Sequence, residues 1–105
     1  MMSRRYILAA AISAVFAVSA HAETIKISID KLVFDESGVN AKVGDTIEWV
    51  NNDVLAHTAT ARNGDWDVAI PAKATASLTL KKAGTIDYYC RYHPNMKGRI
   101  VIAPK

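Results

Sequence analysis

Cysteine is almost absent from this sequence: Cys90 is the only one, so no disulfide can form within the chain. Long basic runs are also lacking, since none exceeds Lys81-Lys82, and this argues against a nucleic-acid-binding protein. Beyond residue 22, no apolar stretch approaches the roughly 20 residues that a membrane-spanning helix needs. Internal repeats, low-complexity segments and linkers are absent as well. These absences point to a small protein without a second domain.

The first 22 residues have the three parts of an export signal. Arg4 and Arg5 supply a positive start, and residues 6–20 form an almost unbroken apolar stretch. Residues 20–22 then read Ala-His-Ala, which is a small-x-small cleavage site. Because the paired arginines also resemble a twin-arginine signal, the Sec and twin-arginine routes both stay open. We therefore expect cleavage after residue 22 and export to the periplasm.

The expected mature chain, residues 23–105, has 83 residues and forms one domain. Removing the leader takes away two of the 13 basic residues and none of the 10 acidic ones, so the net charge falls from +3 to +1. We expect this chain to be a monomer with no membrane span. A domain of this size has a modest core, so an additional internal staple would help to hold it together.

The mature chain has the pattern of short strands separated by turns, with little sign of helix. The main β-favourable segments are residues 25–29, 46–50, 75–81, 85–90 and 98–102. In the fourth of these, alternation places Tyr88 and Cys90 on the same face, which we assign to the interior. Seven to eight strands at roughly ten-residue spacing predict an all-β fold, a Greek-key antiparallel β-sandwich.

The side chains that bind soft metals are concentrated in one constellation. In the mature chain, the single cysteine, the single methionine and both histidines are Cys90, Met96, His57 and His93. One thiolate and two imidazoles with a weak axial thioether are the ligands of a blue-copper electron-transfer centre. Magnesium and calcium prefer oxygen, and structural zinc sites have more cysteines and no methionine. The sequence thus predicts one type 1 copper ion that alternates between Cu(I) and Cu(II).

The spacing of these residues suits a metal site built on a loop. Cys90, His93 and Met96 follow one another at steps of three between the last two expected strands. A loop can direct three side chains to one point, whereas a strand sends neighbouring side chains to opposite faces. His57 comes from a separate segment, which a sandwich can place beside the loop. Pro94 stiffens the loop, and a rigid frame keeps the ligands still when the copper changes oxidation state.

The motif Cys90-x-x-His93-x-x-Met96 resembles that of the cupredoxins, and among them the amicyanins. The likeness continues through residues 43–51, 83–90 and 97–102. It covers most of the mature chain and is weakest at the N-terminus. The resemblance implies the Greek-key sandwich of that family, and it implies that His57 together with the three loop residues of the motif are the copper ligands.

The chain departs from the amicyanin pattern at several positions beside the ligands. Amicyanins usually have an asparagine after the first histidine ligand, where its side chain ties the two ligand segments together; this chain has Thr58. Arg91 and Tyr92 stand where amicyanins have threonine and proline, and Asn95 replaces a phenylalanine. Because the loop surface differs, the family's electron donor, methylamine dehydrogenase, is not carried over to this protein.

These observations lead to two hypotheses of function. The first is a periplasmic type 1 copper protein, not an enzyme, that carries single electrons between transient redox partners and uses His93 as its electron port. Pro94, Leu55 or Ile70 would ring that port, and scattered basic side chains would steer an acidic partner. The alternative is a periplasmic copper carrier or buffer without an electron-transfer role. An enzyme with Cys90 as nucleophile is disfavoured, because no orienting third residue is visible.

Overall fold

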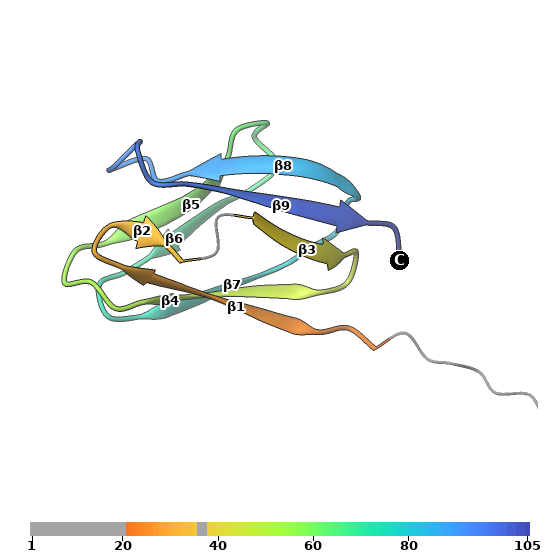
Figure 1. Ribbon diagram of the computed structural model, residues 1–105, viewed down its shortest axis with the longest axis horizontal. Helices are drawn as coiled ribbons and strands as arrows, with labels where there is room; N and C mark the ends of the chain where they lie inside the picture. The colour runs from red at the N-terminus through yellow and green to blue at the C-terminus, as the bar shows by residue number, and fades with distance from the viewer. Residues whose placement is uncertain (1–20, 36–37) are drawn as a thin grey trace, which may run out of the picture.

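The computed structural model describes residues 21–35 and 38–105, which form nine β-strands and no helix (Figure 1). The strands are β1 (Thr24–Asp30), β2 (Val33–Phe34), β3 (Gly38–Lys42), β4 (Thr46–Asn51), β5 (His57–Ala61), β6 (Asp67–Ile70), β7 (Thr75–Thr79), β8 (Gly84–Tyr89) and β9 (Lys97–Ala103). Nothing in the described part of the chain is a helix that could cross a bilayer. Most of the predicted export signal, residues 1–20, lies outside the described residues.

The strands form two sheets, and the predicted all-β sandwich is confirmed. One sheet has the order β2-β1-β4-β7, and the other has the order β3-β9-β8-β5-β6. Most neighbours are antiparallel as expected, but β1 pairs with β4 and β3 pairs with β9 in parallel. Parallel neighbours require a crossover connection. Between β1 and β4 the chain visits the opposite sheet to form β3, and alternation within a strand gives no sign of such a crossing.

Alternating side chains from both sheets fill the space between them. In β1 and β4 the buried residues are the apolar members of each alternation, with Ile27, Ile29, Ile47 and Trp49 fully buried. Tyr88 of β8 faces them from the other sheet, as predicted, and is also fully buried. The two sheets therefore share one continuous hydrophobic core.

Tyr88 lies at the centre of an aromatic cluster in this core. Its ring meets those of Phe34, Trp49 and Trp66 at centroid distances of 4.9, 5.7 and 5.7 Å. The indole N–H of Trp49 donates a hydrogen bond of 3.3 Å to the Tyr88 hydroxyl. Burial, only partly opposed by that bond, raises the pKa of Tyr88 to about 12. Gly98 of β9 packs against the ring so closely that any Cβ there would collide with it.

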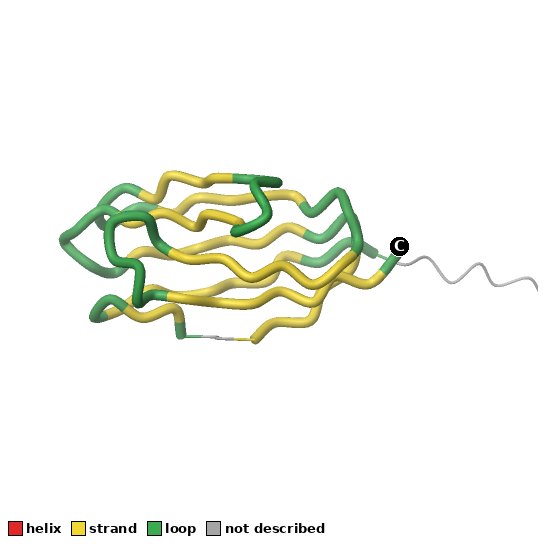
Figure 2. The backbone as a smooth tube through the Cα atoms, turned by 90° about the horizontal axis from the view of Figure 1, so that it is seen from above, coloured by secondary structure: helices red, strands yellow, loops and turns green. Residues whose placement is uncertain are grey.

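Four connections gather at one end of the sandwich, which we call the ligand end. They are the β1–β2, β4–β5, β6–β7 and β8–β9 connections, which lie at the left of Figure 1, opposite the C-terminus. Figure 2 shows the strands running side by side along the molecule, with connections at both ends. Because the strands fix the bases of these loops, side chains from distant parts of the sequence meet at the ligand end.

Candidate metal centre

His57 is the first residue of β5 and pairs with Ile70 of β6. Its side chain is buried, with 1% of the residue exposed. The Nε2 atom lies 2.8 Å from a carboxylate oxygen of Asp53. An ionised carboxylate only accepts hydrogen bonds, so Nε2 carries the proton and donates it, and Nδ1 keeps its lone pair. The ring therefore presents Nδ1 as a possible metal donor.

Asp53 contacts the His57 ring, a role that the sequence did not indicate. Its carboxylate also accepts the backbone N–H groups of Lys31 and Leu32, at 2.7 and 3.0 Å. Burial alone would raise the pKa of Asp53, but the Leu32 N–H, the His57 ring and the Lys31 N–H lower it below its usual value. Lys31 and Leu32 have φ angles of 54° and 62°, so their left-handed turn directs both N–H groups at one carboxylate. Asp53 thus ties the β1–β2 turn to His57.

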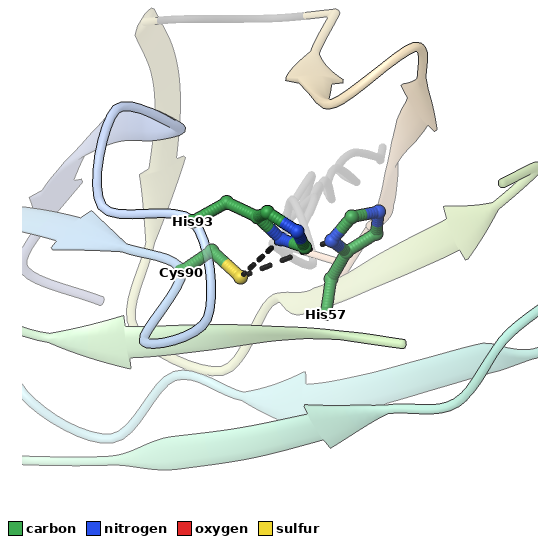
Figure 3. Close-up of side chains that lie close together, drawn as sticks. All are labelled: His57, Cys90 and His93. Atoms are coloured by element: carbon green, nitrogen blue, oxygen red, sulfur yellow. Dashed lines mark hydrogen bonds between the residues drawn. The ribbon is translucent and has the colours of Figure 1, made fainter. Parts of the chain in front are cut away.

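Cys90 and His93 approach His57 from the β8–β9 connection, as Figure 3 shows. The sulfur of Cys90 lies 3.8 Å from Nδ1 of His57 and 3.8 Å from Nδ1 of His93. The possible ligand atoms of the three residues all lie within 4.8 Å of one another. Cys90 is fully buried, whereas His93 is partly exposed. The structure therefore brings these three predicted residues together, although 33 positions separate His57 from Cys90 in the sequence.

Residues 90–96, which we call the ligand loop, are closed by two backbone hydrogen bonds. The N–H of Cys90 donates to the carbonyl of Met96 at 3.1 Å, and the N–H of Met96 donates to the carbonyl of His93 at 2.9 Å. Met96 is 3% exposed and lines the same hollow as His93. Pro94 lies exposed within the loop. The loop is thus a compact turn that keeps three predicted ligands close together.

The donor set and its spacing fit a single soft metal ion. For zinc, whose bonds to sulfur and nitrogen are about 2.3 and 2.0–2.1 Å long, an S–metal–N angle of about 120° places S and N roughly 3.8 Å apart, and the same spacing suits other ions of similar size. The two measured sulfur–nitrogen separations are both 3.8 Å. One thiolate with two neutral imidazoles is a copper-type ligand set. The group is also largely shielded from water, because Cys90 and His57 are both buried.

Thr58 provides the link between ligand segments that the sequence left open. Its backbone N–H donates to the sulfur of Cys90 at 3.4 Å. Its hydroxyl oxygen accepts the backbone N–H of Arg91, the next residue in the ligand loop, at 2.9 Å. A fully buried threonine on β5 therefore holds the start of the ligand loop through both its backbone and its side chain. The hydrogen bond expected from an asparagine is made here by a hydroxyl.

Asn51 is a second residue whose role the sequence did not indicate, because the segment Asn51-Asn52-Asp53 suggested only a turn. It is 2% exposed, and its amide nitrogen lies 2.9 Å from the carbonyl of Leu55 and 3.1 Å from that of Pro71. Its side-chain oxygen accepts the N–H of Asp53 at 2.9 Å. Asn51 thereby joins the β4–β5 and β6–β7 connections.

The partly exposed edge of His93 lies in a shallow hollow at the ligand end. The hollow is lined by Leu32, Tyr92, His93, Pro94, Asn95 and Met96. Leu32 and Tyr92 are 41% and 56% exposed, and Leu55 of the neighbouring loop is 48% exposed. The prediction that Ile70 rings this surface is wrong, since Ile70 is fully buried. As the last residue of β6, it points into the core opposite His57 in the strand register.

Comparison with known proteins gives a consistent family assignment. The model of the cupredoxin-like domain family matches residues 5–102. The amicyanin of Paracoccus denitrificans is 32% identical over 84 residues, which cover 74% of this chain and 64% of that protein. This chain therefore spans a little under two thirds of that relative's length.

Solved structures support the same assignment. The crystal structure of the amicyanin of Paracoccus versutus is 28% identical, covers 81% of this chain and 84% of its own, and gives a TM-score of 0.66. A structure of an amicyanin variant with Cu(I) is 30% identical, covers 75% of this chain and 81% of its own, and gives a TM-score of 0.65. The resemblance to the cupredoxins, and among them to the amicyanins, is confirmed.

Proposed function

Because this chain belongs to the cupredoxin-like domain family, we propose that it is a periplasmic copper protein that carries single electrons between larger redox partners. Its cofactor is one type 1 copper ion, as the donor set predicted. The observation that carries the proposal is the convergence of Cys90, His57 and His93, with both sulfur–nitrogen separations at 3.8 Å. The redox partners of the relatives are not assigned to this chain.

We assign the four predicted ligands distinct roles. His57, Cys90 and His93 would hold the ion through Nδ1, Sγ and Nδ1, and the buried Met96 would supply a weak thioether donor that tunes the reduction potential. Bound copper supplies a one-electron change between Cu(I) and Cu(II). The chain contributes ligands whose positions depend little on the ion. Asp53 orients His57, Thr58 holds the sulfur, and the backbone hydrogen bonds close the loop.

Electrons would enter and leave at the partly exposed edge of His93. That edge is surrounded by mainly apolar surface from Leu32, Tyr92 and Pro94. We call these three residues and His93 the docking face. Redox partners meet over small areas and separate quickly, and a shallow, mainly apolar face suits such an encounter. By contrast, the buried Cys90 is closed to a substrate, so we propose no bond chemistry at this centre.

The charges beside the docking face favour an acidic partner. Lys31, Lys73 and Lys97 are exposed at or near the ligand end, and none of them forms an ion pair with another described residue. Of the acids in the nearby connections, Asp53 is turned inward onto His57, and Asp30 remains exposed. A positive border around an apolar centre accelerates encounter with a negatively bordered partner and gives an association rate that falls with salt.

The decisive test is spectroscopy and voltammetry of the copper-loaded protein. We expect an intense blue absorption band, a small copper hyperfine splitting and reversible one-electron voltammetry. Colourless binding, irreversible reduction and rapid loss of the ion to a chelator would instead identify a copper carrier or buffer. Electron transfer to hexacyanoferrate(III), an anionic probe, should slow several-fold in Lys31→Glu. The matched variant Lys81→Glu, at the other end of the sandwich, should leave that rate unchanged.

Export can be tested separately, because it rests on residues outside the described part of the chain. The predicted leader, residues 1–22, should be absent from protein recovered from the periplasm of a Gram-negative host, leaving Glu23 as the first residue. Full-length protein retained in the cytoplasm would contradict the proposed location and leave the proposed copper chemistry untouched.

A further inference from the structure

Thr58, Thr60, Asp67 and Arg91 form a closed ring of hydrogen bonds beside the ligand loop. The hydroxyl oxygens of Thr58 and Thr60 lie 2.9 Å apart, and the Thr60 hydroxyl donates to Asp67 at 2.7 Å. Asp67 also accepts two contacts from Arg91, from Nε at 3.3 Å and from a terminal nitrogen at 3.2 Å. Arg91 completes the ring through its backbone N–H, which donates to Thr58.

The acceptor-only carboxylate of Asp67 sets the direction of every hydrogen bond in this ring. Because Thr60 donates its proton to Asp67, its oxygen must accept the proton of Thr58. The oxygen of Thr58 is then free to accept the backbone N–H of Arg91. Asp67 therefore orients the hydroxyl that holds the ligand loop, although it touches none of the predicted metal ligands itself.

The ring connects an edge strand to the ligand loop. Asp67 begins β6, the outermost strand of its sheet, and pairs in register with Thr60 of β5. Thr58 and Thr60 are two positions apart on β5, so both hydroxyls lie on one face of the strand. The Thr60 hydroxyl and the Arg91 guanidinium together lower the pKa of Asp67, so its carboxylate stays ionised at neutral pH.

We propose that Asp67 and Thr60 are positioning residues for the copper centre, which they act on by orienting the Thr58 hydroxyl and by anchoring Arg91 beside Cys90. This inference rests on the proposed copper function. Two residues of the ring, Thr58 and Arg91, are positions at which this chain departs from the amicyanin pattern. The ring supplies an alternative way to fix the start of a ligand loop that lacks a proline at this point.

An exposed arginine–aspartate pair usually contributes little to stability, so the matched control is a second such pair in the same sheet. Arg99 and Asp87 pair across β9 and β8, at 2.7 and 3.4 Å, with side chains 58% and 49% exposed. Arg91 and Asp67 are similarly exposed, at 43% and 51%. Asp87→Ala therefore removes the same kind of pair without touching the ring.

The experiment compares Asp67→Ala and Thr60→Val with Asp87→Ala and the parent protein, all loaded with copper. Copper affinity is measured by competition with a chelator, the hyperfine splitting by electron spin resonance, and hydrogen exchange of the Arg91 amide in the diamagnetic Cu(I) form. Both ring variants should lose affinity several-fold, less than the roughly 10–100-fold expected for a residue that contacts a ligand directly. They should also change the hyperfine splitting and speed exchange at Arg91, whereas Asp87→Ala should match the parent.

Thr60→Val is the sharper variant, because it keeps the β-branched shape and touches neither Arg91 nor a ligand. If Asp67→Ala fails to fold, Thr60→Val alone decides the question. The proposal is overturned if the parent is blue and redox-active but Thr60→Val matches it in affinity, splitting and exchange. A parent protein without the blue band would overturn the proposed function together with this inference, so the two failures are distinguishable.

Discussion

Replacement of Thr58 by valine is the most informative single perturbation of the ligand end. Valine keeps the β-branched shape of threonine and the backbone N–H that donates to Cys90, but it removes the hydroxyl. Two hydrogen bonds of 2.9 Å are lost, to the Arg91 N–H and to the Thr60 hydroxyl. Thr58 is fully buried whereas Arg91 is exposed, so water replaces the lost acceptor only in part.

The size of the effect follows from the group that is left without a partner. The donor is the Arg91 N–H in a part-buried contact, so its loss should cost about 1 kcal/mol, the lower end of the range for a buried donor without an acceptor. In a domain of this size each kcal/mol lowers Tm by about 4–8 °C. Copper affinity should fall by roughly 10–100-fold, because the Thr58 hydroxyl holds the ligand loop beside Cys90. The two losses have one cause, namely release of the first residues of the ligand loop.

Thr58→Ser is the matched control, because it removes only the methyl group and keeps the hydroxyl. Thermal unfolding of the metal-free proteins and chelator competition with the copper-loaded proteins measure the two effects separately. We expect Thr58→Ser to stay close to the parent in copper affinity. Equal affinities for the valine and serine variants would refute the argument that the hydroxyl holds the loop.

Three further predictions address the core and the axial position. Gly98→Ala should lower the free energy of unfolding by about 1–3 kcal/mol, because the new methyl group collides with the Tyr88 ring; a melting curve equal to that of the parent would contradict this. The pKa of Tyr88 is raised from 10.0 to about 12, so the folded state keeps a proton that the unfolded chain releases. Stability contributed by Tyr88 is therefore complete below pH 10 and is lost towards pH 12, by about 3 kcal/mol at roughly 1.4 kcal/mol per pH unit. Denaturant titrations should show this alkaline loss in the parent and not in Tyr88→Phe. Met96→Leu should raise the reduction potential and keep the blue colour, and a colourless variant would exclude a purely axial role for the thioether.

The strands and the three converging ligands could be predicted because each leaves a local pattern. Alternation placed Ile27, Ile29 and Tyr88 in the core, and the steps of three placed Cys90 and His93 on one loop. The parallel pairings were not predictable in this way, because they depend on which sheet the chain enters after each turn.

The supporting polar residues left a weaker signal. Asp53 and Asn51 read as ordinary turn residues, since aspartate and asparagine are common in turns. Only the folded arrangement shows that their side chains point inward, where one binds His57 and the other binds carbonyls of two connections. Thr58 drew notice only as a departure from a family pattern, and its hydroxyl bond to Arg91 depends on a contact between distant segments.

The parallel pairing of β3 with β9 bears on the order in which the molecule assembles. The last strand must find a partner that was synthesised long before it, and such non-local contacts form slowly. Until the sandwich has closed, the Cys90 sulfur lacks the buried surroundings that it has in the folded protein, and its thiol is open to oxidants. Cys90 is therefore most easily oxidised before the chain has folded. Metal bound early would protect its sulfur as well as complete the site.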